Sequence, residues 1–280
     1  MKVRIASPAT LCLLFAGITL SPAPAALGQQ DAGQVHSPSK YLRIGNVELK
    51  PEQTGAYAKI EREEVEAQRA ANAPNHYLTL SSITGGSHVL YMHGFESFAD
   101  MQKDHAAAMA MTKLQDTLRA DNAEEGPMIA AVHNSIYSYE KDLSLGAAID
   151  LSKMRFMRII LFHVRSGHRQ EWEHVVKLLV KEYQSSIPEA RWAMFEKMYG
   201  QGSDNTYILA TPMESLATVD AMHDDNKFSE SVGPDQLDLL RKGLDATIES
   251  SESDLFAFSS GMSYVPDSWL TASPDFWGKK

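Results

Sequence analysis

Two segments of the chain, 76–83 and 191–199, place aromatic side chains on the same strand face as hydroxyl and carboxyl groups, since alternate residues of a strand share a face. Aromatic walls with a few polar groups are typical of pockets for small, mostly apolar molecules. The pattern therefore predicts a ligand-binding face, with filling of the space between two sheets as the structural alternative. The residues on this face are Tyr77, Thr79, Ser81, Trp192 and Glu196.

Two arginines stand at matching positions on two further predicted strands. Arg43 lies in the segment 41–49 and Arg158 in the segment 155–164. Both are predicted to belong to the ligand-binding face. Structural ion pairs, or positions at the rim of the sheet, are the alternative interpretation.

Signatures of the common catalytic classes are missing from the sequence. It has no serine-hydrolase elbow, no zinc-protease motif, no phosphate loop and no dinucleotide fingerprint. His168 and Glu171 have the i, i+3 spacing that could hold a metal ion on a helix, but a solvated charge pair in a first turn explains them better. No metal site is predicted, and the catalytic residues and cofactors stay unassigned.

The first 28 residues are predicted to form a signal peptide. A short basic head precedes an apolar run, and small residues then offer a cleavage site after Gly28, with Ala25 as second choice. The alternative is an uncleaved anchor. The expected location is therefore secreted or periplasmic, with no membrane span after cleavage. The single cysteine, Cys12, lies within this leader, so we expect neither disulfides nor cysteine chemistry in the mature chain.

The charge of the chain argues against nucleic-acid binding. Its formal net charge is −10 at pH 7, and it contains no run of basic residues. The segment 29–40 is polar and rich in small residues, which predicts a disordered lead-in.

An internal repeat organises the rest of the chain. An offset of 115 aligns Arg43 with Arg158 and Tyr77 with Trp192, and an offset of 118 beyond the glycine-rich turn aligns His105 with His223. Each copy has the predicted order strand, helix, two strands of a hairpin, helical region, strand. The predicted units are 41–145 and 146–260.

The order β-α-β-β-α-β is that of a ferredoxin-like unit, which has helices on only one face of its sheet. The other face must be covered, and two copies in one chain can cover each other. The expected fold class is α+β, with two tandem ferredoxin-like units that form an intramolecular α+β barrel. The predicted ligand-binding face should then line the barrel interior. This arrangement leaves the oligomeric state open.

In the second copy, a strand is followed by Arg165-Ser166-Gly167-His168, a helix, and the strand Thr206-Tyr207-Ile208-Leu209. This order is similar to that of NIPSNAP-like and antibiotic-biosynthesis-monooxygenase-like domains. The chain thus resembles the dimeric α+β-barrel superfamily in a fused tandem form, over about 41–260. The resemblance implies the fold and leaves a choice of functions: cofactor-free monooxygenase, haem-degrading or haem-peroxidase-like enzyme, isomerase, or a protein without activity.

Haem-degrading relatives keep an asparagine on the first strand and a histidine on the second helix. The resemblance makes Asn46 and His105 the haem candidates of this chain, whereas Leu161 replaces the asparagine in the second copy. The alternative for His105 is a histidine at a helix C-terminus, where its charge suits the helix dipole.

The last segment, 261–280, carries Tyr264, Trp269, Phe276 and Trp277 between turn-forming residues. It is expected to pack back on the barrel through Trp269 or Trp277, with partner binding as the alternative. The expected function is an exported protein that binds a small apolar or aromatic ligand, in the manner of a cofactor-free monooxygenase or a haem-handling enzyme. The alternative is a non-catalytic exported binding or scaffold protein.

Overall fold

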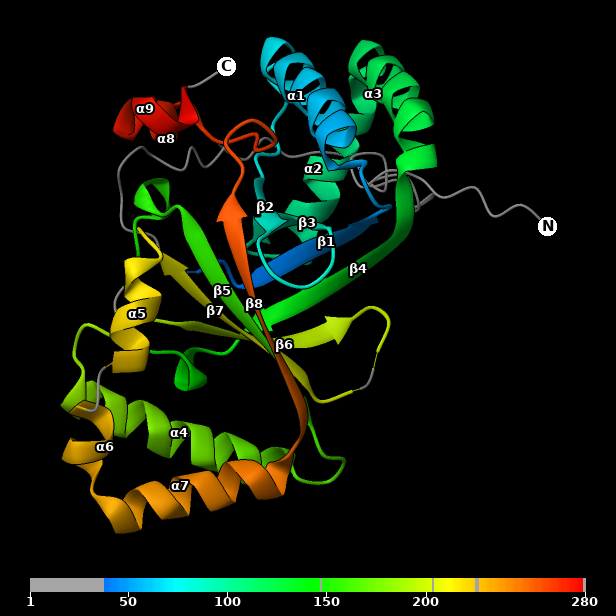
Figure 1. Cartoon of the computed structure of the whole chain (residues 1–280). Helices are drawn as coiled ribbons and strands as arrows, with labels where there is room; N and C mark the ends of the chain where they lie inside the picture. Colours follow the sequence, from blue (N-terminus) through cyan, green and yellow to red (C-terminus); the bar gives the residue numbers. More distant parts are fainter. Residues whose placement is uncertain (1–37, 147, 203, 225–226, 279–280) are drawn as a thin grey trace.

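The computed structural model of the chain describes residues 38–278 except 147, 203 and 225–226. The predicted signal peptide and nearly all of the predicted lead-in lie outside the described residues. Within them, the order of elements in the first half of the chain repeats in the second, where the helical region after the hairpin is broken more often (Figure 1).

The first half contains four strands and three α-helices. The segments predicted from the sequence are present, with helix boundaries that differ by a few residues. The elements are β1 (Tyr41–Leu49), α1 (Thr54–Ala70), β2 (Leu78–Ser82), β3 (His88–Phe95), α2 (Phe98–Ala110), α3 (Thr112–Glu125) and β4 (Ile129–Tyr139).

The second half follows the same plan. Gly233, with φ of 80°, precedes a helix that starts at Pro234. The elements are β5 (Phe156–Val164), α4 (Arg169–Ser186), β6 (Ala193–Tyr199), β7 (Thr206–Met213), α5 (Ala217–Asp224), α6 (Lys227–Val232), α7 (Pro234–Thr247) and β8 (Ile248–Phe258).

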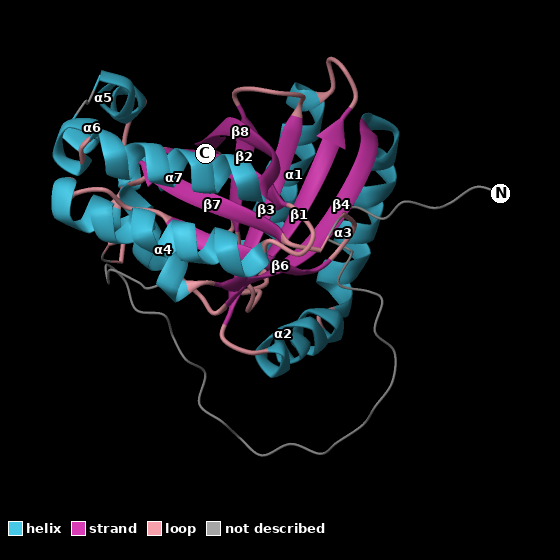
Figure 2. Cartoon of the chain, turned by 90° about the horizontal axis from the view of Figure 1, so that it is seen from below, coloured by secondary structure: helices cyan, strands magenta, loops and turns pink. Residues whose placement is uncertain are grey.

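The eight strands form one closed antiparallel barrel in the order β1-β3-β2-β8-β5-β7-β6-β4. The strand order β4-β1-β3-β2 of the first half is matched by β8-β5-β7-β6 in the second, and the seams are the pairs β2–β8 and β4–β6. Helices α1 to α3 cover one side of the barrel, and α4, α6 and α7 cover the opposite side (Figure 1). Helices α4 and α7 pack side by side (Figure 2). The expected α+β barrel is therefore confirmed.

An apolar core fills the barrel interior. It draws side chains from all eight strands, among them Leu42, Leu80, Tyr137, Phe195, Ile208 and Phe256. Two further apolar clusters lie outside the barrel, one under α1 and α3 and one under α4.

This packing contradicts the expectation that the predicted ligand-binding face lines the barrel interior. Side chains alternate along each strand, so Leu78 and Leu80 point into the barrel while Tyr77, Thr79 and Ser81 point out of it. The same alternation turns Arg43, Arg158, Trp192 and Glu196 outward. The apolar residues fill the interior because the polar ones find hydrogen-bonding partners among the outer helices and loops.

The C-terminal segment packs back on the barrel as predicted. It forms α8 (Asp267–Ala272) and α9 (Pro274–Trp277), which lie beside each other at one end of the molecule (Figure 1). Trp277 is 4% exposed and belongs to the core of the barrel interior. Its indole nitrogen donates a hydrogen bond of 2.7 Å to the carbonyl of Ser152. Trp277 is therefore the anchor of this segment.

Candidate functional site

A small cavity of about 40 Å³ lies in the first half, between the sheet β1-β3-β2 and the helices α1 to α3. We call it the first-half pocket. Its wall combines aromatic and polar side chains from the strands with apolar ones from the helices. Arg43, Tyr91 and His93 come from the strands, Tyr77 lies directly before β2, and α1 adds Gln68.

Aromatic rings form the strand side of this pocket. The ring centroid of Tyr77 lies 5.9 Å from that of Tyr91 and 5.2 Å from that of His93. The amide of Gln68 donates a hydrogen bond of 3.1 Å to the hydroxyl of Tyr77. Tyr77 is thus the one residue of the predicted ligand-binding face that joins Arg43 at this pocket.

A chain of hydrogen bonds leads from the pocket wall into the protein. The hydroxyls of Tyr91 and Tyr57 are 2.8 Å apart, and the hydroxyl of Tyr57 donates to Oε1 of Glu61 over 2.7 Å. With the Tyr57 proton committed to the carboxyl group, the hydroxyl of Tyr91 donates to Tyr57. The oxygen of Tyr91 then keeps a lone pair with which it can accept a proton from the pocket.

Three glutamates lie without exposed surface at the interface of α1 and α3: Glu61, Glu64 and Glu125. Burial raises the pKa of Glu61, although the hydrogen bond from Tyr57 opposes the shift. Burial also raises the pKa of Glu64 well above its usual range, and the neighbouring carboxyl groups of Glu61 and Glu125 add to this. Neither carboxyl oxygen of Glu64 has a hydrogen-bonding partner in the described part of the chain. The carboxyl groups of Glu61 and Glu64 therefore resist ionisation.

Burial, with a contribution from Arg43, disfavours the charged form of two histidines near the pocket. Burial lowers the pKa of His93 to about 3, and the nearby guanidinium of Arg43 contributes. The pKa of His105 is also lowered by burial and by Arg43. His93 is therefore a neutral imidazole at physiological pH, able to exchange hydrogen bonds with a ligand.

The two haem candidates lie on opposite faces of the sheet. Asn46 is three residues from Arg43 on β1, so its side chain points to the other face, where it contacts His88 at 3.1 Å. His105 lies on α2, near Arg43 on the outer face. One haem could not contact both. Neither residue lines the first-half pocket, so the two do not form a joint haem site there.

Thr79 is hydrogen-bonded to the C-terminal segment. Its amide donates to the hydroxyl of Ser263 over 2.9 Å, and its own hydroxyl donates to the carbonyl of Met262 over 2.7 Å. Ser81, two residues further, is half-buried on the same outward face. These two residues therefore do not reach the first-half pocket.

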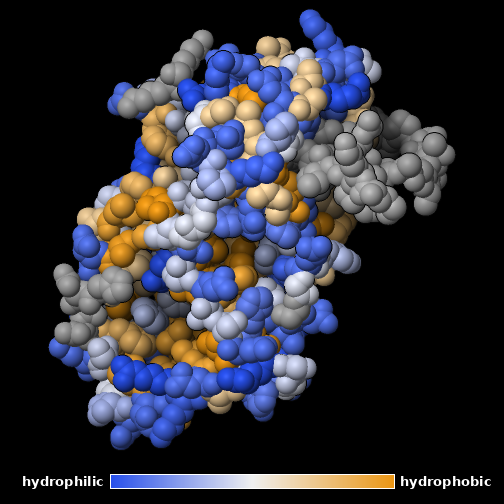
Figure 3. Space-filling model, turned by 45° about the vertical axis from the view of Figure 1, so that its right-hand side comes forward, coloured by the Kyte–Doolittle hydropathy of each residue, from blue (hydrophilic) through white to orange (hydrophobic). Residues whose placement is uncertain are grey.

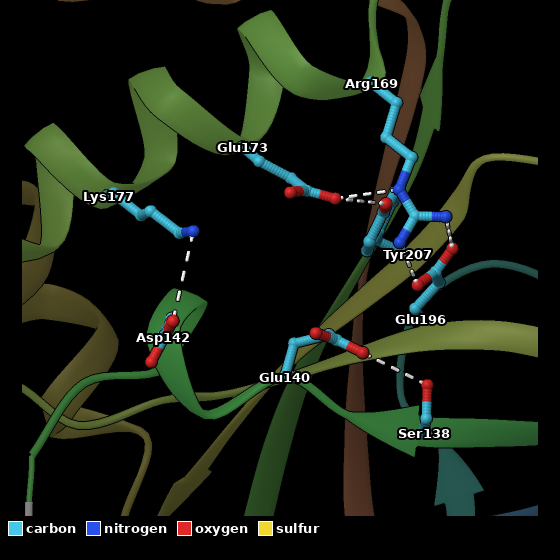
Figure 4. Close-up of polar contacts among 8 residues, drawn as sticks. All are labelled: Ser138, Glu140, Asp142, Arg169, Glu173, Lys177, Glu196 and Tyr207. Carbon is cyan, nitrogen blue, oxygen red and sulfur yellow. Dashed lines mark hydrogen bonds and ion pairs between the residues drawn. The ribbon is translucent and has the colours of Figure 1, made fainter.

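Glu196 belongs to an ion-pair network in the second half (Figure 4). The guanidinium of Arg169 pairs with both carboxyl oxygens of Glu196, at 2.5 and 2.6 Å, and with Glu173 at 2.8 Å. Beside this network an open cleft of about 270 Å³ is lined by Glu140, Asp142 and Lys177 among others. Because Arg169 is paired with the carboxylates of Glu173 and Glu196, the network joins the start of α4 to β6.

Trp192 and Arg158 occupy the layer between the second sheet and its helices. Trp192 packs against the apolar cluster under α4, and its indole nitrogen donates to the carbonyl of Leu143 over 2.9 Å. Arg158 lies on β5 and is half-buried. They are the counterparts of Tyr77 and Arg43, so the seven predicted residues are divided between the two halves of the molecule and do not form one site.

The sequence did not reveal Tyr57 or the buried glutamates as site residues. One signal was available: Tyr57, Glu61 and Glu64 recur at helical spacing on the face of α1 that also carries Ile60 and Val65. Acidic residues on the apolar face of a helix are unusual and indicate a buried polar network.

Two features are absent from the described residues. No group of three histidine, cysteine or acidic residues in them has a geometry that could hold a metal ion. None of the helices described between residues 38 and 278 combines the length and hydropathy that a membrane crossing requires.

Comparison with known proteins identifies the fold. No family model matches the chain, and no curated protein matches it in sequence. A candidate monooxygenase from Fusobacterium nucleatum is similar in structure, with a TM-score of 0.52, 10% identity, and coverage of 80% of this chain and 94% of the other. An anthrone oxidase-like protein gives a TM-score of 0.52 with 14% identity, covering 79% of this chain and 92% of the other.

A variant of the chlorite dismutase from Candidatus Nitrospira defluvii is a more distant match. Its TM-score is 0.42 at 11% identity, with 80% of this chain and 92% of the other covered. At these identities the comparisons concern architecture only. The chain has the α+β-barrel fold of candidate monooxygenases and anthrone oxidase-like proteins.

Proposed function

We propose that the protein is an exported, cofactor-independent monooxygenase-like enzyme whose substrate is a small, mostly apolar molecule with an acidic proton. The observation that carries the proposal is the hydrogen-bonded chain from Tyr91 through Tyr57 to Glu61, which connects the wall of the first-half pocket to a buried carboxyl group. The folds of the anthrone oxidase-like protein and of the Fusobacterium nucleatum protein support the choice of reaction class.

The chain of hydroxyls suits proton removal. A substrate proton passes to the oxygen of Tyr91, the Tyr91 proton passes to Tyr57, and the Tyr57 proton passes to Glu61. Both phenols end neutral, and the carboxyl group holds the proton. Because burial raises the pKa of Glu61, its affinity for a proton comes closer to that of a weakly acidic substrate.

Molecular oxygen is the oxidant in this proposal. Deprotonation leaves an electron-rich substrate anion, which can transfer electrons to oxygen directly. For an activated methylene group the net change converts CH₂ and O₂ to a carbonyl group and water, so one oxygen atom enters the product and the other leaves as water. The protein contributes the proton path, the aromatic walls of Tyr77 and Tyr91, and the exclusion of bulk water.

Substrate entry requires the first-half pocket to open. Of the three helices over the first half, α2 has the fewest buried residues: Ala108 is its one buried residue, whereas α1 has six and α3 has three. The chain leaves the helical conformation at Met111, between α2 and α3, with φ of −84° and ψ of 66°. Movement of α2 about Met111 would enlarge the pocket, because Ala108 lines it.

The proposal also includes an internal duplication, in which the two halves of the chain are copies of one unit. The matching strand orders of the two halves and the offsets of 115 and 118 in the sequence support two tandem ferredoxin-like units. Export and the narrower placement among NIPSNAP-like or antibiotic-biosynthesis-monooxygenase-like domains rest on the sequence patterns alone.

The experiment is oxygen uptake with 1,8-dihydroxyanthrone, whose methylene group is weakly acidic. Purified protein is expected to accelerate oxygen consumption and the appearance of 1,8-dihydroxyanthraquinone above the rate in buffer. Tyr91→Phe should lower the accelerated rate by about a hundredfold. Tyr199→Phe is the matched control, because Tyr199 is 59% exposed and far from the proton path in sequence. Equal rates for the two variants would contradict the proposal.

A second candidate function is non-catalytic binding, as in a scaffold protein. The solid apolar core of the barrel interior and the small size of the first-half pocket favour it. Binding of 1,8-dihydroxyanthraquinone to the purified protein without any acceleration of anthrone oxidation would support this alternative.

A further inference from the structure

Three aromatic rings stand together in the second half of the molecule. Tyr183 of α4 lies 5.1 Å from Trp192 with the ring planes at 88°, and 4.1 Å from Phe228 of α6 with the planes at 20°. We call these residues the second-half aromatic cluster. All three are half-buried, so part of each ring is open to solvent.

The sheet beside this cluster is incompletely covered. Ile160 and Leu209 remain partly exposed, whereas their counterparts in the first half, Gly45 and Tyr91, are buried. Figure 3 shows hydrophobic side chains at the surface in the lower part of the molecule, above a row of hydrophilic residues along the edge. The second half thus has apolar surface at the place where the first half has a closed pocket.

A guanidinium group lies within this apolar setting. The Nε atom of Arg158 is buried and has no hydrogen-bonding partner among the described residues. Burial lowers the pKa of Arg158, and Tyr183 is the neighbour that opposes the shift, which places the two side chains close together. A buried N–H donor without a partner is costly, and a ligand that accepts from it would remove this cost.

We infer that the second half binds a small aromatic molecule with an anionic group, its rings against the second-half aromatic cluster and its anion on Arg158. A carboxylate or a sulfonate matches the fork of a guanidinium and its buried Nε donor. This site goes beyond the proposed function, since it involves none of the residues of the proton path.

The charge of the molecule bears on where an anionic ligand would bind. The chain has a formal net charge of −10, so it does not attract anions in general. In the first half, the counterpart Arg43 lines a pocket of only about 40 Å³, which is too small for an aromatic anion unless it opens. An anionic ligand should therefore prefer the second half.

The test uses two fluorescent probes that differ in one group. The probe 1-anilinonaphthalene-8-sulfonate carries an anion, and N-phenyl-1-naphthylamine has the same rings without it. Arg158→Met is expected to weaken binding of the sulfonate roughly tenfold and to leave binding of the neutral probe within about twofold. Phe228→Ala is expected to weaken both probes, because it removes a ring contact that both share.

Matched variants distinguish binding at Arg158 from a general loss of folding and from binding in the first half. Arg241→Met changes an exposed arginine of α7 in the same half and should leave both affinities unchanged. Arg158→Lys keeps the charge and should bind the sulfonate more tightly than Arg158→Met, a difference that misfolding would not produce. Unchanged sulfonate affinity in Arg158→Met, or an equal loss in Arg43→Met, would overturn the inference.

Discussion

The hydroxyl of Tyr57 donates a hydrogen bond to Oε1 of Glu61 over 2.7 Å, one turn further along α1, and neither residue has exposed surface. The carboxyl group of Glu61 is thus reached from the first-half pocket through two phenols and not through solvent. A base in this position can be selective, because it accepts protons from a molecule in the pocket and is shielded from bulk water.

Replacement of Glu61 by glutamine removes the end of the proton path while keeping its shape. The rate of anthrone oxidation is expected to fall by at least about a hundredfold. In the wild-type protein the rate should rise with pH as Glu61 ionises, at a pH above the usual range for a glutamate. Glu63→Gln is the control, since Glu63 lies on the same helix with a side chain that is 61% exposed. A wild-type pH profile in Glu61→Gln would show that another group is the base.

The buried Glu64 should make the protein less stable at high pH. Its pKa is raised in the folded state, so its favourable contribution is complete below the unfolded value of about 4.3 and is lost as pH rises through the folded value. Glu64→Gln cannot ionise and should gain thermal stability over the wild-type protein between pH 5 and pH 9. The measurement is the difference in Tm at each pH. A constant difference across this range would contradict the prediction.

His93 should stay neutral throughout the physiological range. Its folded pKa of about 3 lies below the usual value of about 6.5, so its contribution to stability is present above pH 6.5 and declines as pH falls toward 3. The NMR shifts of its ring protons are expected to remain constant from pH 8 to pH 5, with His93→Gln used to assign the signals. A midpoint near 6.5 would mean that the pocket is open to water.

Trp277 should carry most of the stability that the C-terminal segment adds. Trp277→Ala removes a nearly fully buried ring and leaves the carbonyl of Ser152 without its 2.7 Å partner, so a loss of about 3–5 kcal/mol in the free energy of unfolding is expected. Trp269→Ala removes a ring that is only half-buried and should cost less. Urea unfolding measures both. Equal losses would show that neither ring is the anchor.

The fold could be predicted because it depends on patterns that repeat locally. Alternation on strands, the helical spacing of apolar residues and the offset between the two copies all indicated the order of elements. The start of β8 was less evident, because residues 249–253 are polar and exposed, and become a strand only by pairing with β5. Long-range pairing of this kind leaves little trace in a local pattern.

The site was harder to predict than the fold. Alternation showed that Tyr77, Thr79 and Ser81 share a face, but not which face of the sheet turns into the barrel. That choice depends on which alternate residues pack together across all eight strands, and the apolar set containing Leu80 and Phe256 occupies the interior. The pocket residues Tyr57 and Glu61 come from a helix, and their contact with Tyr91 exists only in the folded chain.

The decisive experiment for the proton path is a crystal structure of the protein with 1,8-dihydroxyanthraquinone, the product of the proposed reaction. We expect the ligand in the first-half pocket between β1-β3-β2 and α1 to α3, with an oxygen within hydrogen-bonding distance of Tyr91 and α2 displaced from its position here. A ligand bound elsewhere, with this pocket still closed and Tyr91 untouched, would contradict the proposed reaction.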